Sequence, residues 1–159
     1  QANNVYYVDL QTDEINTSKY YKFKYDLNGK YIISISENKD KNTEADYALV
    51  KFVLESDYIE QHSIYIYGEL TNWDILPSAK MNYDKTENQY YGFLYLKQGY
   101  YNYHYALKDT TTNRVDVSFI EGTHYQTRND YYIYVYYRKV GDRYDRLVGF
   151  LKTSSKELF

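Results

Sequence analysis

The chain is built from short runs in which apolar and polar residues alternate, separated by polar turns. Residues 64–67 alternate Ile and Tyr up to Gly68, and a polar turn that carries Trp73 follows. Another run ends at Lys97, and a tight turn at Gly99 leads at once into a further run. Alternation with a period of two predicts half-buried strands, and turns of this kind join antiparallel neighbours. Residues 64–105 therefore predict half of an antiparallel β-sandwich.

The same pattern predicts strands elsewhere in the chain. The expected ranges are 5–10, 20–27, 31–36, 46–56, 115–120, 131–138 and 147–151. Asn28-Gly29 predicts a hairpin turn between the second and third of these runs, because both residues tolerate a positive φ.

The run 131–138 is the most regular predicted strand. Ile133 and Val135 share one of its faces, since successive side chains of a strand point to opposite sides. The tyrosines on the other face are Tyr132, Tyr134 and Tyr136.

The number and spacing of the short strands predict an all-β sandwich, because no amphipathic helix longer than two turns is found. We expect the sandwich to span residues 46–151, followed by a tail at 152–159. Residues 1–45 are interpreted as an N-terminal β-hairpin segment that ends a preceding domain. The alternative, left open by the sequence, is that residues 1–55 add strands to the sandwich.

The composition limits both the structures that the chain can form and the partners that it can bind. Tyrosine occurs 25 times and aromatic residues make up 20% of the chain, which suits half-buried sheet surfaces. The net charge is −3 and the Lys and Arg residues are spread along the chain, so a nucleic-acid partner is disfavoured. The chain has no cysteine, which excludes disulfides and thiol chemistry. It also lacks an apolar run of 18 residues, so we expect no membrane-spanning helix.

The sequence offers little that predicts catalysis. His62, His104 and His124 are far apart, and their spacing does not resemble a set of metal ligands. Neither a G-x-S-x-G elbow nor a glycine-rich phosphate loop is present. No set of nucleophile, base and orienting group can be assembled, so we expect no enzyme activity, metal or cofactor.

The charged segment 141–146 contains two Asp and two Arg residues. Asp142 and Asp145 flank Arg143 and Arg146, which predicts two ion pairs within a turn. A solvated structural turn is the simpler interpretation, and a partner-binding loop is the functional alternative.

Trp73 is the residue with the sharpest functional alternative. A tryptophan in a polar loop can serve as a flat platform for a sugar ring or for an apolar side chain of a partner. The structural alternative is that its indole folds back as a lid on the edge of the sandwich.

The residues 65–73, Met81 and 99–103 resemble the glycogen-binding type of early-set immunoglobulin-like module, which has a G-x-F-N-x-W-like turn and a later G-x-Y-x-Y strand. The resemblance covers about residues 63–137 and implies an immunoglobulin-like antiparallel sandwich. It also implies that Trp73 matches a platform tryptophan and that Asn129 matches a sugar-contacting asparagine. His104 stands where those modules place a lysine, and the chain has no second tryptophan.

A second resemblance covers nearly the whole chain. The runs that carry it are 26–33, 45–48, 96–103, 120–122, 135–138 and 141–149, together with Thr127, Asn129 and Tyr131. Together they resemble the C-terminal part of the type IX secretion system plug family, formerly a family of unknown function. The resemblance implies a periplasmic β-rich protein of a Gram-negative cell envelope, and the C-terminal half of a longer exported protein. Its implied partner is the very large outer-membrane translocon barrel, which such a protein closes from the periplasmic side.

The leading hypothesis is thus a protein-interaction module that acts by steric occlusion. Tyrosine gives a large contact area at low entropic cost, so the predicted contact residues are Tyr134, Tyr136, Arg143 and Arg146. The rival hypothesis is a carbohydrate-binding module. Its predicted site consists of Trp73, His104 and Asn129.

Overall fold

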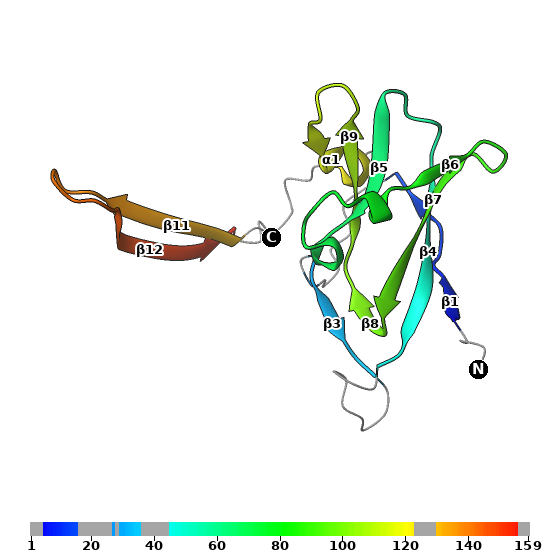
Figure 1. The fold of residues 1–159 in the computed structure, drawn as a ribbon, viewed down its shortest axis with the longest axis horizontal. Helices are drawn as coiled ribbons and strands as arrows, with labels where there is room; N and C mark the ends of the chain where they lie inside the picture. Colours follow the sequence, from blue (N-terminus) through cyan, green and yellow to red (C-terminus); the bar gives the residue numbers. More distant parts are fainter. Residues whose placement is uncertain (1–4, 16–26, 28, 36–44, 123–129, 156–159) are drawn as a thin grey trace. The chain divides into compact units, whose positions relative to one another are not determined.

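The computed structural model describes residues 5–15, 27, 29–35, 45–122 and 130–155 (Figure 1). The chain divides into two compact units, the first comprising residues 1–20 and 24–123, the second residues 21–23 and 124–159. The strands of the first unit are β1 (Tyr6–Asp9), β2 (Asp13–Glu14), β3 (Tyr31–Ile33), β4 (Tyr47–Glu55), β5 (His62–Tyr67), β6 (Asn82–Asp84), β7 (Gln89–Lys97), β8 (Gly99–Tyr101), β9 (His104–Asp109) and β10 (Val115–Asp116). Its short helices are η1 (Glu69–Thr71), η2 (Pro77–Ala79) and α1 (Ser118–Glu121).

The described residues of the first unit form three sheets. Strands β1, β4, β7 and β6 follow one another in a five-stranded sheet, in which β2 also pairs with β4. The antiparallel β4–β7 pair forms its centre and runs from Tyr47 opposite Lys97 to Glu55 opposite Gln89. A second sheet has the order β10-β9-β5, and β3 pairs with β8.

The core of the first unit lies between the two larger sheets. Phe52 and Leu54 of β4 are buried, and so are Ile64 and Ile66 of β5 and Tyr105 of β9. All five belong to one hydrophobic cluster, as the alternation along each strand predicts. The predicted all-β sandwich is therefore confirmed.

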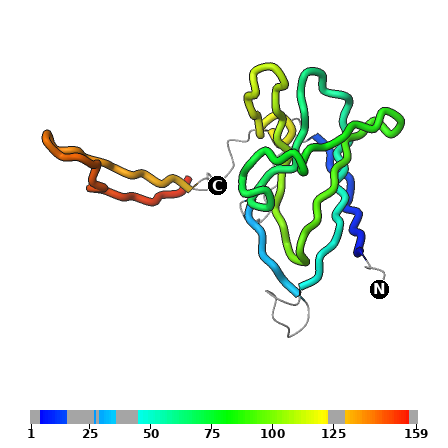
Figure 2. Tube along the Cα trace, in the orientation of Figure 1, coloured from blue at the N-terminus to red at the C-terminus, as the bar shows by residue number. Residues whose placement is uncertain are grey.

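The N-terminal strands differ from their expected place. β1 pairs in parallel with β4, and β3 pairs antiparallel with β8, so each has its partner strand within residues 46–151 (Figure 2). Leu10 and Ile15 pack against the core cluster, which explains why this segment joins the sandwich. The expected boundary between residues 45 and 46 is thus wrong. Except for Leu27, the predicted strand 20–27 lies outside the described residues, as does Asn28 of the predicted turn.

A carboxylate attaches the N-terminal segment to the second sheet. The hydroxyls of Tyr103 and Tyr105 both donate to Oδ2 of Asp13, over 2.8 and 2.7 Å. Burial, together with the nearby Asp13, raises the pKa of both tyrosines well above the ordinary value. The neutral, donating form of each hydroxyl is therefore favoured.

The range 115–120 was predicted as extended, and the structure corrects this prediction. Only Val115–Asp116 is strand, and a single helical turn follows at Ser118–Glu121. Oδ1 of Asp116 accepts hydrogen bonds from the backbone N–H and the hydroxyl of Ser118, both over 2.7 Å. This local bonding competes with a strand ladder and lets Ile120 turn into the core.

The described part of the second unit is a β-hairpin. β11 (Asp130–Tyr137) pairs antiparallel with β12 (Arg146–Ser154). Both strands were predicted, but the expected sandwich limit at residue 151 is wrong, because β12 continues to Ser154 into the expected tail. Among the described strands β11 pairs with β12 alone, so the hairpin is not a part of the sandwich sheets.

Candidate functional site

Three rings from two strands and a turn meet at one edge of the sandwich. Tyr67 and His104 are cross-strand neighbours on β5 and β9, with ring centroids 5.2 Å apart. The indole of Trp73 lies 5.8 Å from the ring of Tyr67 and 6.0 Å from that of His104. We call these three residues the Trp73 cluster.

The turn that carries Trp73 has a defined local cause. After Gly68 the chain makes the single turn η1, and Asn72 and Trp73 then adopt positive φ angles of 53° and 57°. The hydroxyl of Tyr67 donates to the backbone carbonyl of Trp73 over 3.0 Å, and Thr71 bonds back to the carbonyl of Gly68. These bonds hold the indole beside the ends of β5 and β9.

The segment before β3 packs on the same turn. The backbone N–H of Glu69 donates to the carbonyl of Gly29 over 2.9 Å, and the carboxylate of Glu69 accepts from the N–H of Tyr31. A Cβ at Gly29 would collide with Cη2 of Trp73. Glycine is therefore required at position 29 both for its φ of 74° and for this close approach.

Trp73 combines the two expected roles. One edge of its indole packs against Gly29, as a lid would, while 45% of the residue remains exposed, as a platform requires. A hollow of about 330 Å³ adjoins His104 and is also lined by Asn102, Val117 and Glu121. Burial lowers the pKa of His104, so its imidazole is neutral at pH 7. The arrangement offers a ring face beside a few polar groups.

The structure brings together two of the three residues of the predicted glycan site. The structure places Trp73 and His104 in contact, whereas Asn129 lies outside the described residues. The contact with Gly29 was missed by sequence reasoning, which interpreted Asn28-Gly29 only as a hairpin turn.

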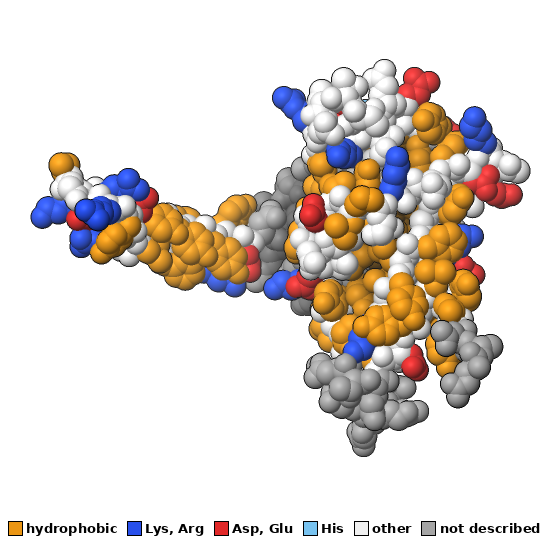
Figure 3. All heavy atoms as spheres, in the orientation of Figure 1, with side chains coloured by type: hydrophobic (Ala, Val, Ile, Leu, Met, Phe, Trp, Pro, Cys, Tyr) orange, Lys and Arg blue, Asp and Glu red, His pale blue; other side chains and the backbone are white. Residues whose placement is uncertain are grey.

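The hairpin of the second unit presents an aromatic face. Tyr134 of β11 and Phe150 of β12 lie opposite each other with ring centroids 5.3 Å apart. Tyr132 lies on the same face, with Nζ of Lys152 5.2 Å from its ring centre. All eight residues of β11 are exposed, and hydrophobic side chains line the strands (Figure 3). Tyr134 and Tyr136 therefore lie on an open surface, as the contact hypothesis requires.

The opposite face of the hairpin is aliphatic at its centre, between Tyr131 and Tyr137. Ile133, Val135 and Leu151 lie on it and are 48–56% exposed. The sequence predicted that Ile133 and Val135 share a face of a strand within the expected sandwich. Exposure of aliphatic side chains at this level is unusual for a strand face and marks a contact surface.

The charged turn pairs differently from expectation. Arg146 binds Asp142 over 2.9 Å, while Asp145 binds Arg138 through two hydrogen bonds of 2.8 and 3.0 Å. The expected pairing of Asp145 within the segment 141–146 is thus wrong, because Arg138 reaches it across the hairpin. Residues 138–146 contain four Lys or Arg and two Asp residues, so the turn is basic within an acidic chain.

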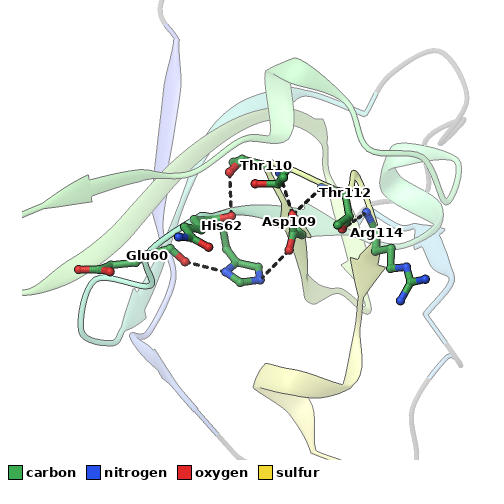
Figure 4. A network of polar contacts seen from close by, with 8 residues as sticks. Glu60, His62, Asp109, Thr110, Thr112 and Arg114 are labelled. Atoms are coloured by element: carbon green, nitrogen blue, oxygen red, sulfur yellow. Dashed lines mark hydrogen bonds and ion pairs between the residues drawn. The ribbon is translucent and has the colours of Figure 1, made fainter.

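A polar network surrounds the β9–β10 turn (Figure 4). His62 contacts the carbonyl of Glu60 through Nδ1 over 2.7 Å, and its Nε2 lies 3.9 Å from Asp109. Asp109 also accepts from the backbone N–H groups of Thr111 and Thr112, which lower its pKa. The bonds to Asp109 fix the turn, and the described residues contain no group of three potential metal ligands.

Comparison with known proteins adds one informative structure. The chain resembles the crystal structure of a hypothetical protein from Parabacteroides merdae ATCC 43184, with 40% identity and a TM-score of 0.85. The match covers 96% of this chain but 38% of that protein, so the chain spans well under half the length of its structural neighbour. No protein-family model matches the chain, and no curated protein matches it. The described helices are all too short to cross a membrane.

Proposed function

We propose that this chain is a non-enzymatic protein-interaction module whose contact surface is the β11–β12 hairpin. The observation that carries the proposal is the exposure of every residue of β11, aromatic and aliphatic alike. A two-stranded hairpin is only marginally stable when it packs against nothing. A partner that covers these faces would remove a large apolar area from water.

The type of partner comes from the sequence resemblance to the type IX secretion system plug family. On that basis the module acts in the periplasm of a Gram-negative bacterium and helps to close the outer-membrane translocon from the periplasmic side. Occlusion needs an adaptable contact surface rather than a deep pocket. Tyrosine and arginine are the residues enriched at such interfaces, and the hairpin has both.

A pull-down from detergent-solubilised envelope of the source bacterium tests this function. The bait is the purified chain, compared with a Tyr134→Ser/Tyr136→Ser variant. The matched control is Tyr100→Ser, which removes an exposed tyrosine of the first unit. We expect a very large outer-membrane barrel, identified by mass spectrometry, with the wild type and the control, and at least tenfold less with the hairpin variant. Absence of the barrel from the wild-type sample would refute the secretion-plug role.

Carbohydrate binding is the second candidate function, and the contact between half-exposed Trp73 and His104 favours it. Aromatic platforms bind sugars through their ring faces, while polar neighbours pair with hydroxyls. If this function is correct, immobilised polysaccharide retains the chain, and Trp73→Ala abolishes the retention without affecting recovery of the barrel. Equal retention of the chain and the variant would exclude Trp73 as the platform.

A further inference from the structure

Among the described residues, no strand pairs with the outer edge of β11 between Tyr131 and Tyr137. Among the described strands β11 pairs with β12 alone, and its eight residues are all exposed. The backbone N–H and C=O groups along such an edge are free to pair with another strand, and an exposed hydrophobic edge favours this pairing. The edge is therefore an interaction surface in addition to the two faces of the hairpin.

The two edges of the hairpin are not equivalent. β11 has no Gly, Pro or charged residue between Tyr131 and Tyr137. On β12 the register changes, because Gly149 lies opposite Val135 while Leu147 lies opposite Tyr136. One extra residue on β12 makes a bulge, which disrupts the ladder and protects that edge from pairing. β11 is thus the edge suited to accept a further strand.

We propose that β11 pairs antiparallel with β11 of a second copy of this chain, about a two-fold axis at Tyr134. In this register Ile133 of one copy lies opposite Val135 of the other, and Tyr132 lies opposite Tyr136. Aliphatic residues thus meet at the centre of one face, where Tyr131 lies opposite Tyr137 at the ends, and aromatic residues meet on the other face. Such cross-strand pairs stabilise neighbouring strands. The product is a four-stranded antiparallel sheet with an isologous interface, the commonest kind in homodimers.

Charge favours an antiparallel over a parallel pair. Asp130 and Arg138, at the two ends of the segment, already bind Lys152 and Asp145 within the hairpin, so the register does not need an ion pair between the copies. The antiparallel arrangement directs the two basic turns away from each other, whereas a parallel pair would bring them together. A strand from an unrelated protein would match this hydrophobic pattern only by coincidence, and a second copy matches it by symmetry.

The dimer goes beyond the proposed function and does not depend on it. Edge pairing leaves both faces of the hairpin free, so the four-stranded sheet would double the surface available to another protein. Dimerisation is measured with the purified 159-residue chain alone, and capture of the barrel is measured separately. A chain that does not dimerise can therefore be distinguished from a chain that does not capture the barrel.

Sedimentation velocity of the purified chain over a concentration series tests the association. We expect the mass to rise from 19.2 kDa towards twice that value with increasing concentration. A monomer at every concentration, up to the millimolar range, would overturn the proposal and leave the edge to a strand from another protein.

Single cysteines test the register, because the chain has none of its own. Tyr134→Cys places two thiols directly opposite each other, and we expect a disulfide-linked dimer under mild oxidation. Tyr132→Cys is the matched control, since both tyrosines are 52% exposed on the same strand and face. Its two thiols would lie about 13 Å apart along the strands, too far for a disulfide.

A mixture of two variants completes the test of the register. Tyr132→Cys mixed with Tyr136→Cys brings the two thiols opposite each other, so the cross-linked species should contain one copy of each. Selective linkage at 134 and in this mixture supports the two-fold register. Equal linkage of the 134 and 132 variants would overturn it, because it would show collision without a fixed arrangement.

Discussion

At the scale of single residues, the fold depends on a few positions where distant segments come very close. Gly29 and Trp73 are the clearest pair, since any side chain at position 29 meets the indole. Trp73 is also the only tryptophan in the chain, so its fluorescence reports on this contact directly.

We expect Gly29→Ala to lower the free energy of unfolding of the first unit by about 1–3 kcal/mol. The new Cβ is strained at a φ of 74° and collides with the indole. Urea unfolding followed by Trp73 fluorescence measures the change. Gly141→Ala is the control, because Gly141 also has a positive φ but no atom within 4 Å of the added Cβ. Wild-type stability in the Gly29 variant would show that the contact does not form.

His104 should make stability depend on pH. Burial lowers its pKa in the folded protein below the value of about 6.5 that it has when unfolded. The unfolded chain therefore binds the proton first, and stability falls as the pH drops below about 6.5. We expect the urea midpoint to fall between pH 7 and pH 5, and to fall less in His104→Gln. Parallel pH curves for the two proteins would contradict a buried, neutral His104.

At the scale of elements, Asp13 joins the N-terminal segment to Tyr105 of β9 and to Tyr103 just before it, through their hydroxyls. We expect Asp13→Ala to destabilise the first unit by about 1–3 kcal/mol, because it leaves Tyr105 buried without its acceptor. Asp13→Asn, which keeps an acceptor oxygen, should lose less. Urea unfolding compares the three proteins, and equal stability of the Ala variant and the wild type would mean that the tyrosines find another partner.

The elements themselves were largely predictable from the sequence, and their partners were not. Alternation along 64–67 predicted a half-buried strand, and the structure buries Ile64 and Ile66 on one of its faces. The same pattern at 5–10 showed that a strand exists but could not show that it pairs with β4, which lies about 40 residues away in the sequence. At 115–120 the local structure follows from the hydrogen bonds that Asp116 accepts from Ser118, and not from the hydrophobic pattern.

The sequence predicted those residues of the candidate site that belong to a recognisable motif. Trp73 and His104 were named from the resemblance to glycogen-binding modules, and they do meet. Gly29 was missed because its contact joins segments far apart in the sequence. Arg138 was missed for a similar reason, since its ion pair with Asp145 forms only when the hairpin closes.

At the scale of the whole molecule, the residues of the hydrophobic core cluster all lie in the first unit. We therefore expect a chain truncated after Thr123 to fold, with a free energy of unfolding within about 0.5 kcal/mol of the full chain. Urea unfolding by Trp73 fluorescence measures this. Leu54→Ala, which opens a cavity in the core, is the positive control and should lose about 2–5 kcal/mol. Loss of cooperative unfolding on truncation would show that the first unit is not autonomous.

The parallel pairing of β1 with β4 has a consequence for the order of folding. Tyr6 aligns with Ala48, so β1 has no partner until the chain has extended through β4. At roughly 5–20 residues per second, β1 waits for several seconds during synthesis before its partner strand exists. β4 also pairs over nine residues with β7, against four residues with β1. β1 is therefore made before β4 but docks after it, and it completes the sheet instead of nucleating it.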